Sequence, residues 1–286
     1  MKKQMTIPEL REFAATIRLE TLKIIASFGR GHVGGCLSIA DAMAVLYGRY
    51  MNVDPGDPLM KDRDWCVLSK GHAGPVFYAT LGLCGFFPPE EALTLNQGGS
   101  RFPSHSDHLL TPGVDLTTGS LGQGISEAAG AALGNRLQGI GSRVYVFVGD
   151  GEADEGEVWE AAQFAAHYHL DHLIALIDEN GRQLDGTCEE VMSHGKGLAA
   201  KFDAFGWKVL DVKDGNDIEQ IDKALAEAQN ADGRPVALIL HTVKGKGIRF
   251  AEESGAHSSG LSKEEWADVI EEAEENLSKI REGACA

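Results

Sequence analysis

The sequence predicts an α/β fold with a doubly wound, mostly parallel sheet and helices on both of its faces. Short apolar segments of strand length alternate with segments of helical periodicity, a spacing typical of strand-helix-strand units. The 286 residues, 43% of them apolar and 24% charged, suffice to bury a large core. Because no break in composition suggests a second unit, we expect residues 1–286 to form one domain.

The first half of the chain alternates helices with glycine-rich loops. Thr6 and Glu9 have the spacing of a capping box, and the helical periodicity that follows ends at Gly29. Each of two glycine-rich loops then precedes a further helix. In order, the sequence predicts a helix over 10–28, a loop over 31–35, a helix from Ser38 and Asp41, a strand over 65–68 and a loop over 69–72.

The second half carries most of the predicted strands. A helix rich in small residues begins at Ser120, and small side chains let its backbone approach a sheet or another helix closely. A further helix from about Asn216 separates the last two strands, and a capped acidic amphipathic helix covers 262–280. The predicted strands are 144–148, 173–178, 208–212 and 236–242.

Charge and cysteine usage narrow the class of protein. The net charge of −17, from 43 acidic and 26 basic residues, argues against nucleic acid or an anionic membrane as a partner. No basic leader followed by an apolar run and no stretch of membrane-spanning length is present, so we expect a cytoplasmic protein. The cysteines have no paired spacing, which indicates neither a zinc site nor a disulfide framework: they are Cys36, Cys66, Cys84, Cys188 and Cys285.

Oxygen-bearing side chains follow two successive predicted strands. Asp150 comes after strand 144–148 in a Gly-Asp-Gly turn, and Asn180 comes thirty residues later, after strand 173–178. A right-handed crossover brings both to the carboxyl edge of a parallel sheet. These ligands are too few for Mg²⁺, which completes its octahedron with phosphate oxygens and water. A metal here implies a bound diphosphate, whereas a lone Gly-Asp-Gly triplet would be only a tight turn.

Two groups of histidines have different sequence surroundings. His32, His72, His105 and His257 lie beside small residues in glycine-rich segments, and in a doubly wound fold such loops collect ligands. For any one of them alone, a structural or merely exposed histidine remains an alternative. By contrast, we interpret the other group as structural, because a cation there meets the negative end of a helix: His167, His169 and His172.

Seven segments together resemble the diphosphate-binding half of transketolases. They are GHVGGCLS, SKGHAG, FPSH, TTGSLGQGISEAAGAALG, VGDGEADEG, DENGRQLDG and the late HTVKGKG followed by GAHSSG, in the family's order and spacing over nearly the whole chain. The thirty-residue segment from the Gly-Asp-Gly turn to the Asn matches the thiamine diphosphate motif at both ends.

The resemblance implies a thiamine diphosphate-binding fold and a set of site residues. Asp150, Asn180 and the carbonyl of Arg182 would hold Mg²⁺, which Ca²⁺ or Mn²⁺ can replace. Leu121 would lie under the rings of the cofactor. The other residues expected to contact or approach it are His72, Gly119, Gly149, Gly151, Glu152, Asn180 and His257.

The resemblance also implies how sugars are handled. His32 and His105 would hydrogen-bond the hydroxyls of the substrate, and His257 would take part in proton transfer near the reacting carbon. Neutral imidazoles near physiological pKa suit such a shuttle. Glu155 matches an acid that joins a carboxylate network between two active sites, although a plain helix N-terminal carboxylate explains it equally well. The loop that holds residues 245–249 and 255–260 departs from the common forms of the family. This departure concerns the role of His257 and the binding of the distal end of the substrate.

Transketolases supply the pyrimidine-binding domain, with its activating glutamate, from the second half of a chain about twice this length. We therefore expect an amino-terminal subunit of a split transketolase. A separate carboxy-terminal subunit would carry the pyrimidine-binding domain, and symmetry suggests an α2β2 heterotetramer. The complex would transfer a two-carbon ketol unit from a ketose, in phosphorylated form, to an aldose.

Three alternatives remain open. A 1-deoxyxylulose phosphate synthase or a 2-oxo acid dehydrogenase subunit shares the Gly-Asp-Gly and Asn but not this histidine set. A transketolase for a sulfonated or branched sugar fits the same two-carbon chemistry. A noncatalytic nucleotide-binding or interaction domain of doubly wound fold is the alternative from another class, and Mg²⁺-dependent binding of thiamine diphosphate would exclude it.

Overall fold

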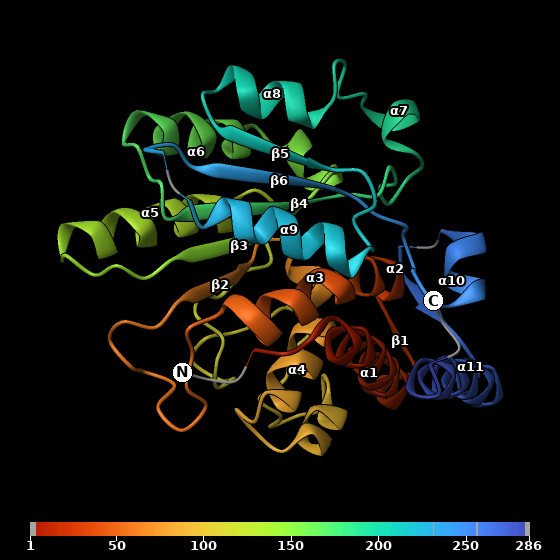
Figure 1. Cartoon of the computed structure of the whole chain (residues 1–286). Coiled ribbons are helices and arrows are strands. Elements are labelled where there is room, and N and C mark those ends of the chain that lie inside the picture. Colours follow the sequence, from red (N-terminus) through yellow and green to blue (C-terminus); the bar gives the residue numbers. More distant parts are fainter. Residues whose placement is uncertain (1–3, 231, 256, 284–286) are drawn as a thin grey trace.

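In the computed structural model, which describes residues 4–230, 232–255 and 257–283, five parallel strands form the central sheet (Figure 1). The strand order is β2-β3-β4-β6-β5, so the chain returns between β4 and β5 to insert its last long strand. The strands are β2 (Trp65–Leu68), β3 (Val144–Gly149), β4 (Leu173–Glu179), β5 (Lys208–Val212) and β6 (Val236–His241).

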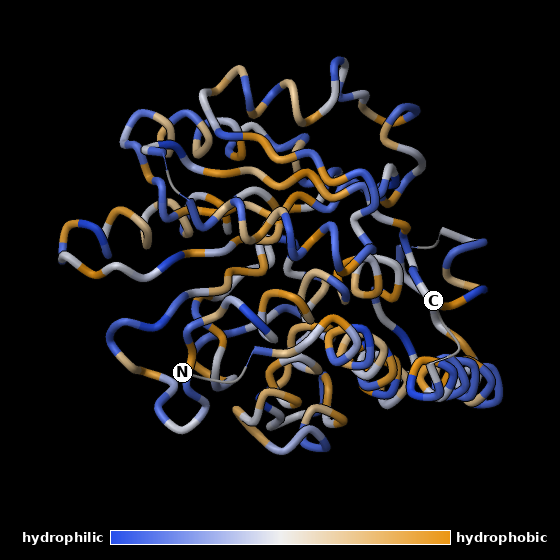
Figure 2. Tube along the Cα trace, in the orientation of Figure 1, coloured by the Kyte–Doolittle hydropathy of each residue, from blue (hydrophilic) through white to orange (hydrophobic). Residues whose placement is uncertain are grey.

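Alternate side chains of the strands enter two separate cores. Tyr145 and Phe147 of β3 face one core, whereas Val144, Val146 and Val148 face the other. Both faces are therefore apolar, and Figure 2 shows the strands as largely hydrophobic. The first core includes α1 (Ile7–Phe28), α3 (Ala40–Val45), α4 (Gly74–Leu83), α9 (Ile218–Ala228) and α11 (Lys263–Arg281); the second includes α5 (Gln123–Leu137), α6 (Gly156–His167) and α8 (Leu198–Ala204).

Helices on both faces of a parallel sheet confirm the predicted fold class. Short helices complete the connections. They are α2 (Val33–Leu37), the π-helix η1 (Leu46–Tyr50), the 3-10 helices η2 (Gly71–Ala73), η3 (Pro89–Thr94) and η4 (Gly151–Asp154), α7 (Cys188–Val191) and α10 (Arg249–Ser254).

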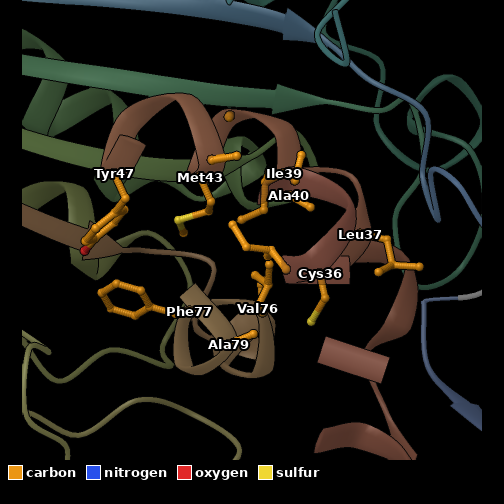
Figure 3. Packing of buried hydrophobic residues seen from close by; sticks show 14 of the residues in the cluster. Cys36, Leu37, Ile39, Ala40, Met43, Tyr47, Val76, Phe77 and Ala79 are labelled. Carbon is orange, nitrogen blue, oxygen red and sulfur yellow. The ribbon is translucent and has the colours of Figure 1, made fainter. Parts of the chain in front are cut away.

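Helices α2, α3 and α4 pack tightly beside the carboxyl edge. Figure 3 shows Cys36 and Leu37 of α2, Met43 of α3, and Val76 and Phe77 of α4 within one apolar layer. Helix α4 is buried along nearly its whole length, so it has no polar face. This packing fixes the glycine-rich loops that run into α2 and α4.

A second, two-stranded sheet pairs a segment that follows α1 with a segment that precedes α11. β1 (Arg30–Gly31) pairs antiparallel with β7 (Ser259–Gly260). The pairing sets the residue after β1, His32, beside the residue two before β7, His257. The sequence did not predict this sheet, because a two-residue strand has no periodicity.

Some boundaries differ from the prediction. The helix expected from Ser120 begins at Gln123. Gly122 has a φ of 88°, in the left-handed region, so a right-handed helix cannot continue through it toward Ser120. The helix expected from Ser38 and Asp41 is α3, which begins at Ala40, and a short helix that was not predicted, α2, precedes it inside the glycine-rich loop. No disulfide joins the described cysteines, Cys36, Cys66, Cys84 and Cys188, and Cys285 lies outside the described residues. Within the described part of the chain, none of the helices combines the length and apolarity needed to cross a membrane.

Candidate functional site

A cleft of about 320 Å³ opens at the carboxyl edge of the sheet. The ends of β3 and β4 form its floor, and the loops after β2 and β6 contribute to its walls. Most of the predicted site residues line it: His72, Leu121, Gly149, Asp150, Gly151, Glu152, Glu155, Asn180, Arg182 and His257.

The side chains of Asp150 and Asn180 are positioned by their own loops. Asp150 accepts backbone hydrogen bonds from Gly151 (2.8 Å) and Gly181 (2.6 Å), so the carboxylate joins the loops after β3 and β4. The amide of Asn180 donates to Asp178 (2.9 Å) and its oxygen accepts from the backbone of Arg182 (3.2 Å). Burial and the neighbouring Asp178 carboxylate raise the pKa of Asp150 to about 6. A cation beside Asp150 would favour its charged form.

A buried ion pair lies under the cleft. The ammonium of Lys70, just past β2, contacts Asp178 of β4 at 2.6 Å and donates to the carbonyl of Gly35 at 2.7 Å. Asp178 also accepts from Ser38 and Thr242. Burial alone would raise the pKa of Asp178, but Lys70 and these donors hold it below its usual value. The pair is therefore internally neutralised and leaves little net charge for a ligand.

Lys244 differs from Lys70. Its side chain is buried, and its ammonium donates only to the carbonyls of Arg182 (3.0 Å) and Gln183 (3.4 Å). Across the described ranges it forms no ion pair. Burial lowers the pKa of Lys244, although Asp150 opposes that change. A buried cation without a paired carboxylate, facing a cleft, favours an anionic ligand.

Glu152 joins three backbone segments around the cleft. One carboxylate oxygen accepts from the Ser69 hydroxyl and from the backbone of Gly122 (2.9 Å), and the other accepts from the backbone of Gly149 (2.9 Å). Burial raises the pKa of Glu152. Both carboxylate oxygens of Glu152 are thus engaged within the protein. They hold together the segments just past β2, at the end of β3 and just before α5.

Three of the four glycine-loop histidines form a close cluster at one end of the cleft. The ring centroids of His72 and His257 lie 4.7 Å apart, those of His32 and His257 5.1 Å, and those of His32 and His72 5.3 Å. His105 approaches His32 at 6.4 Å. Four histidines spread over more than two hundred residues of sequence therefore meet at one place.

Burial is the largest cause of the lowered pKa values of the clustered imidazoles. It lowers the pKa of His257 to about 4, with Lys244, His32 and Lys70 adding to the effect. The pKa of His32 falls for the same reason, with help from His105 and Lys244. That of His72 falls well below its usual value through burial and Lys70. These rings are neutral at pH 7 and can accept or donate protons.

Two predicted residues line a neighbouring hollow instead of the cleft. His105 and Gly119 lie there, and the ring of His105 is exposed to solvent. Leu121, on the cleft side, is 39% exposed although it is large and apolar. Glu155 is exposed at the N-cap of α6. The surface between the hollow and the cleft is thus open and partly apolar.

The shape and polarity of the cleft suit a cation bound together with an anion. A Cβ added at Gly35 would come within 2.9 Å of His72 Nε2, and one at Gly151 within 3.1 Å of the Gln183 side chain, so backbone lines the wall closely. Nδ1 of His257 is buried without a hydrogen-bond partner among the described residues. No three His, Cys, Asp or Glu side chains of the described chain converge on a metal position. A cation would therefore use one carboxylate with amide and carbonyl oxygens, as Mg²⁺ does beside phosphate.

Sequence reasoning missed three charged residues of this site: Lys70, Asp178 and Lys244. A usable signal was present for the first two, since a charged residue at the end of an otherwise apolar strand must find a buried partner. Lys244 has the weaker signal of a lysine before a glycine in the loop after β6.

Comparison with known proteins agrees with this geometry. Residues 10–276 match the family model described as "Transketolase, thiamine diphosphate binding domain". The 6-deoxy-6-sulfo-D-fructose transketolase subunit SqwG of Clostridium sp. (strain MSTE9) is 45% identical over 267 residues, which cover 93% of this chain and 96% of that protein. One of the subunits of the apulose-4-phosphate transketolase of Phocaeicola vulgatus is 35% identical over 92% of this chain and 93% of its own length.

Solved structures of similar proteins share the fold. The transketolase of Campylobacter jejuni superposes with a TM-score of 0.87 and 30% identity, covering 96% of this chain and 43% of that one. A transketolase mutant of Pichia stipitis gives 0.86 and 31%, covering 96% and 41%. The chain thus spans less than half the length of these solved transketolases. The resemblance predicted from the motifs is confirmed: the chain belongs to the transketolase family of ketol-transferring enzymes, with the thiamine diphosphate-binding domain as its match.

Proposed function

We propose that this chain is the amino-terminal subunit of a split, Mg²⁺-dependent transketolase that moves a two-carbon ketol unit from a phosphorylated ketose to an aldose. The observation that carries the proposal is the combination found at one sheet edge. Oxygens of Asp150 and Asn180, the unpaired ammonium of Lys244 and a cluster of neutral histidines border the same cleft.

The metal would be held by Asp150, Asn180 and the carbonyl of Arg182. All three residues line the cleft, and the proposed ligand atoms are hard oxygens, which suit Mg²⁺ and would also accept Ca²⁺ or Mn²⁺. In the structure the Arg182 carbonyl already accepts a hydrogen bond from the Lys244 ammonium, so this oxygen is oriented toward positive charge. Lys244 would add charge for the diphosphate.

The remaining cofactor contacts would come from both walls. Gly149 and Gly151 bring backbone close to the diphosphate, Leu121 offers an apolar surface to the rings, and Gly119 borders the neighbouring hollow. Glu152 would act by fixing the surrounding loops. His72, deep in the cluster, would approach the cofactor. When bound, thiamine diphosphate supplies the nucleophilic carbon that no side chain of this protein provides.

The histidines beside the open hollow would bind the substrate and move protons. His32 and His105 would hydrogen-bond the hydroxyls of the ketose, and His257 would carry a proton between substrate and solvent. Burial lowers the pKa of His257 to about 4, so its ring is neutral at pH 7 and would relay the proton rather than hold it. Glu155 would join a carboxylate network with a second copy, which its exposed position at the start of α6 permits.

A second polypeptide would complete the site. SqwG and the apulose-4-phosphate relative, both of nearly the same length as this chain, are named as transketolase subunits. The exposed Leu121 and the open hollow at His105 support a covering partner that carries the pyrimidine-binding domain. We further propose one domain over 1–286, an α2β2 assembly and a cytoplasmic location. The net charge of −17 supports neither nucleic acid nor an anionic membrane as partner.

Copurification tests this proposal. The chain is isolated with the polypeptide that binds it, and ketol transfer is assayed with thiamine diphosphate, Mg²⁺, a ketose and an aldose. We expect turnover by the complex and none by the chain alone, because an uncovered site leaves the cofactor in water. Full turnover by a preparation that mass spectrometry shows to hold no second polypeptide would refute the proposal of a split enzyme.

A transketolase for a modified sugar is the second candidate. The two relatives above favour it, because one is named as a subunit of a 6-deoxy-6-sulfo-D-fructose transketolase and the other as a subunit of an apulose-4-phosphate transketolase. Fructose 6-phosphate and 6-deoxy-6-sulfo-D-fructose form a matched pair of donors that differ at the distal group. A higher kcat/KM for the sulfonated donor on the same complex would select the modified-sugar function, and the reverse ratio would select the phosphorylated one.

A further inference from the structure

The turn Val243–Lys246 follows β6 after one residue and carries Lys244, which lines the cleft. Several hydrogen bonds hold this turn in place. Within the turn, the backbone N–H of Lys246 donates to the carbonyl of Val243 (3.1 Å). The N–H of Gly245 donates to the carbonyl of Gly34 (3.1 Å), at the start of α2. The turn is thereby tied to the loop that carries His32.

Two side chains from distant parts of the sequence bind further backbone groups of the turn. The amide oxygen of Asn216, in the loop before α9, accepts from the N–H of Val243 at 2.8 Å. Nε of Arg18, on α1, donates to the carbonyl of Lys246 at 3.0 Å. These bonds fix the residues just before and just after the Lys244–Gly245 pair.

Asp41 of α3 connects both side chains. Its carboxylate receives both terminal nitrogens of Arg18 in a bidentate ion pair, and it accepts from the amide of Asn216 at 2.9 Å. Asn216 also donates to the carbonyl of Ser38 at 3.0 Å, while the Ser38 hydroxyl binds Asp178. The network therefore reaches from α1 to the ion pair under the cleft.

The burial of this network argues against a purely stabilising purpose. The side chains of Arg18 and Asp41 are 13% and 7% exposed, so both charges are largely desolvated. A desolvated ion pair gives little net stability relative to apolar side chains of similar volume, but it fixes geometry strictly. This geometry fixes the backbone on both sides of Lys244. Lys244 lines the cleft, and its ammonium lacks a carboxylate partner among the described residues.

We infer that Arg18, Asp41 and Asn216 form a clamp of positioning residues, which holds the turn so that Lys244 faces the diphosphate of the cofactor. The inference rests on the proposed function, because it takes the diphosphate as the anion in the cleft. It extends the site by three residues that do not line the cleft themselves. The clamp acts through Lys244, so its effect depends on the Lys244 ammonium.

Binding of thiamine diphosphate in the presence of Mg²⁺, measured by calorimetry on the chain copurified with its partner, tests the clamp. Asn216→Ala removes the hydrogen bonds of Asn216 to Val243, Asp41 and Ser38 without changing the net charge. We expect roughly five- to tenfold weaker binding, because a displaced Lys244 ammonium would lose the equivalent of one hydrogen bond to the diphosphate. Asp41→Asn should weaken binding similarly. In ketol transfer, both variants should raise the cofactor concentration for half-maximal activity more than they lower kcat.

The matched control is Asp222→Asn. Asp222 also accepts from an arginine, Arg49, and from a second donor, the Tyr50 hydroxyl, and its pair is partly buried between η1 and α9, away from the cleft. A general loss of stability would affect Asp41→Asn and Asp222→Asn alike. Only the clamp variants should change the affinity for thiamine diphosphate.

A double-mutant cycle separates positioning from an independent contribution. Combined with Lys244→Met, Asn216→Ala should cause no further loss, because the ammonium that the clamp positions is already absent. Additive losses, or Asn216→Ala and Asp41→Asn binding as tightly as the unmodified chain, would overturn the clamp while the proposed function stands. If the unmodified complex itself binds no thiamine diphosphate, the proposed function fails, and the inference fails with it.

Discussion

Histidines gather at both ends of the central sheet, and the two groups differ in how they are held. At the carboxyl edge, His32, His72 and His257 come from three distant loops, yet their rings lie within 5.3 Å of one another. At the amino end, three histidines follow one another closely in the sequence. They are His167, His169 and His172, and no two of their rings are in contact within the described residues.

The surroundings of the two groups differ in the same way. Burial and nearby lysines keep the carboxyl-edge rings neutral. At the amino end, His167 and His169 are exposed, and His172 lies within 3.3 Å of the carbonyl of Ser142. Closeness in sequence therefore does not make a site. Convergence of loops at the carboxyl ends of parallel strands does.

The largest expected difference between the two ends concerns metal-dependent binding. Asp150→Ala should abolish Mg²⁺-dependent binding of thiamine diphosphate, since the diphosphate would lose its main counter-charge. Asp171→Ala, at the amino end beside His172, is the control and should bind normally. Calorimetry on the assembled complex measures both. Unchanged affinity in Asp150→Ala would remove the metal assignment.

A smaller effect is expected on chemistry. His105→Ala should keep cofactor binding and assembly but lower kcat/KM for a ketose donor on the order of 10²-fold, if the ring holds the substrate and assists proton transfer. His167→Ala serves as the amino-end comparison. Steady-state kinetics on the two complexes decide the matter, and equal kcat/KM in both would exclude the role of His105.

The histidine cluster at the carboxyl edge should also make the stability of the fold depend on pH. The folded-state pKa of His257 is about 4, below its ordinary value of 6.5, so between these values only the unfolded chain takes up the proton. Stability should therefore fall as pH drops from 6.5 toward 4, with His32 and His72 acting in the same direction. Urea denaturation at about pH 7.5 and about pH 5, either side of the ordinary histidine pKa, should show a smaller drop for His257→Gln than for the unmodified chain. An identical drop would contradict the burial of this ring.

The smallest effect should come from the amino end itself. Replacing His167 and His172 by Gln and His169 by Asn should leave kcat/KM of the complex within about twofold, because surface substitutions rarely matter. Asn is chosen at 169 because the residue there has a φ of 51°, which Asn tolerates. A larger loss in the kinetic assay would show that this end also contributes to function.

The sequence predicted the sheet better than the walls of the site. The predicted strand 208–212 has the observed bounds, and 144–148 and 173–178 each fall one residue short, because buried parallel strands are long apolar runs with clear ends. Asp150 and Asn180 were placed at the carboxyl edge for the same reason. A charged residue at the end of an apolar strand signals that Lys70 and Asp178 each need a buried partner, but no local pattern identifies that partner. The carbonyl of Arg182, which accepts from Lys244, is likewise far away in the sequence.

The short β1–β7 ladder has a consequence for the order in which the molecule is built. It pairs Arg30 with Gly260 and Gly31 with Ser259, so the five strands of the central sheet, which lie between them in the sequence, must be synthesised before it can close. Contacts of such separation form late and slowly compared with local ones. During synthesis on the ribosome the sheet can fold from its amino-terminal strands onward, but His32 acquires its neighbour His257 only when the segment that carries β7 has emerged. The histidine cluster is therefore complete only after all five strands of the central sheet have been synthesised.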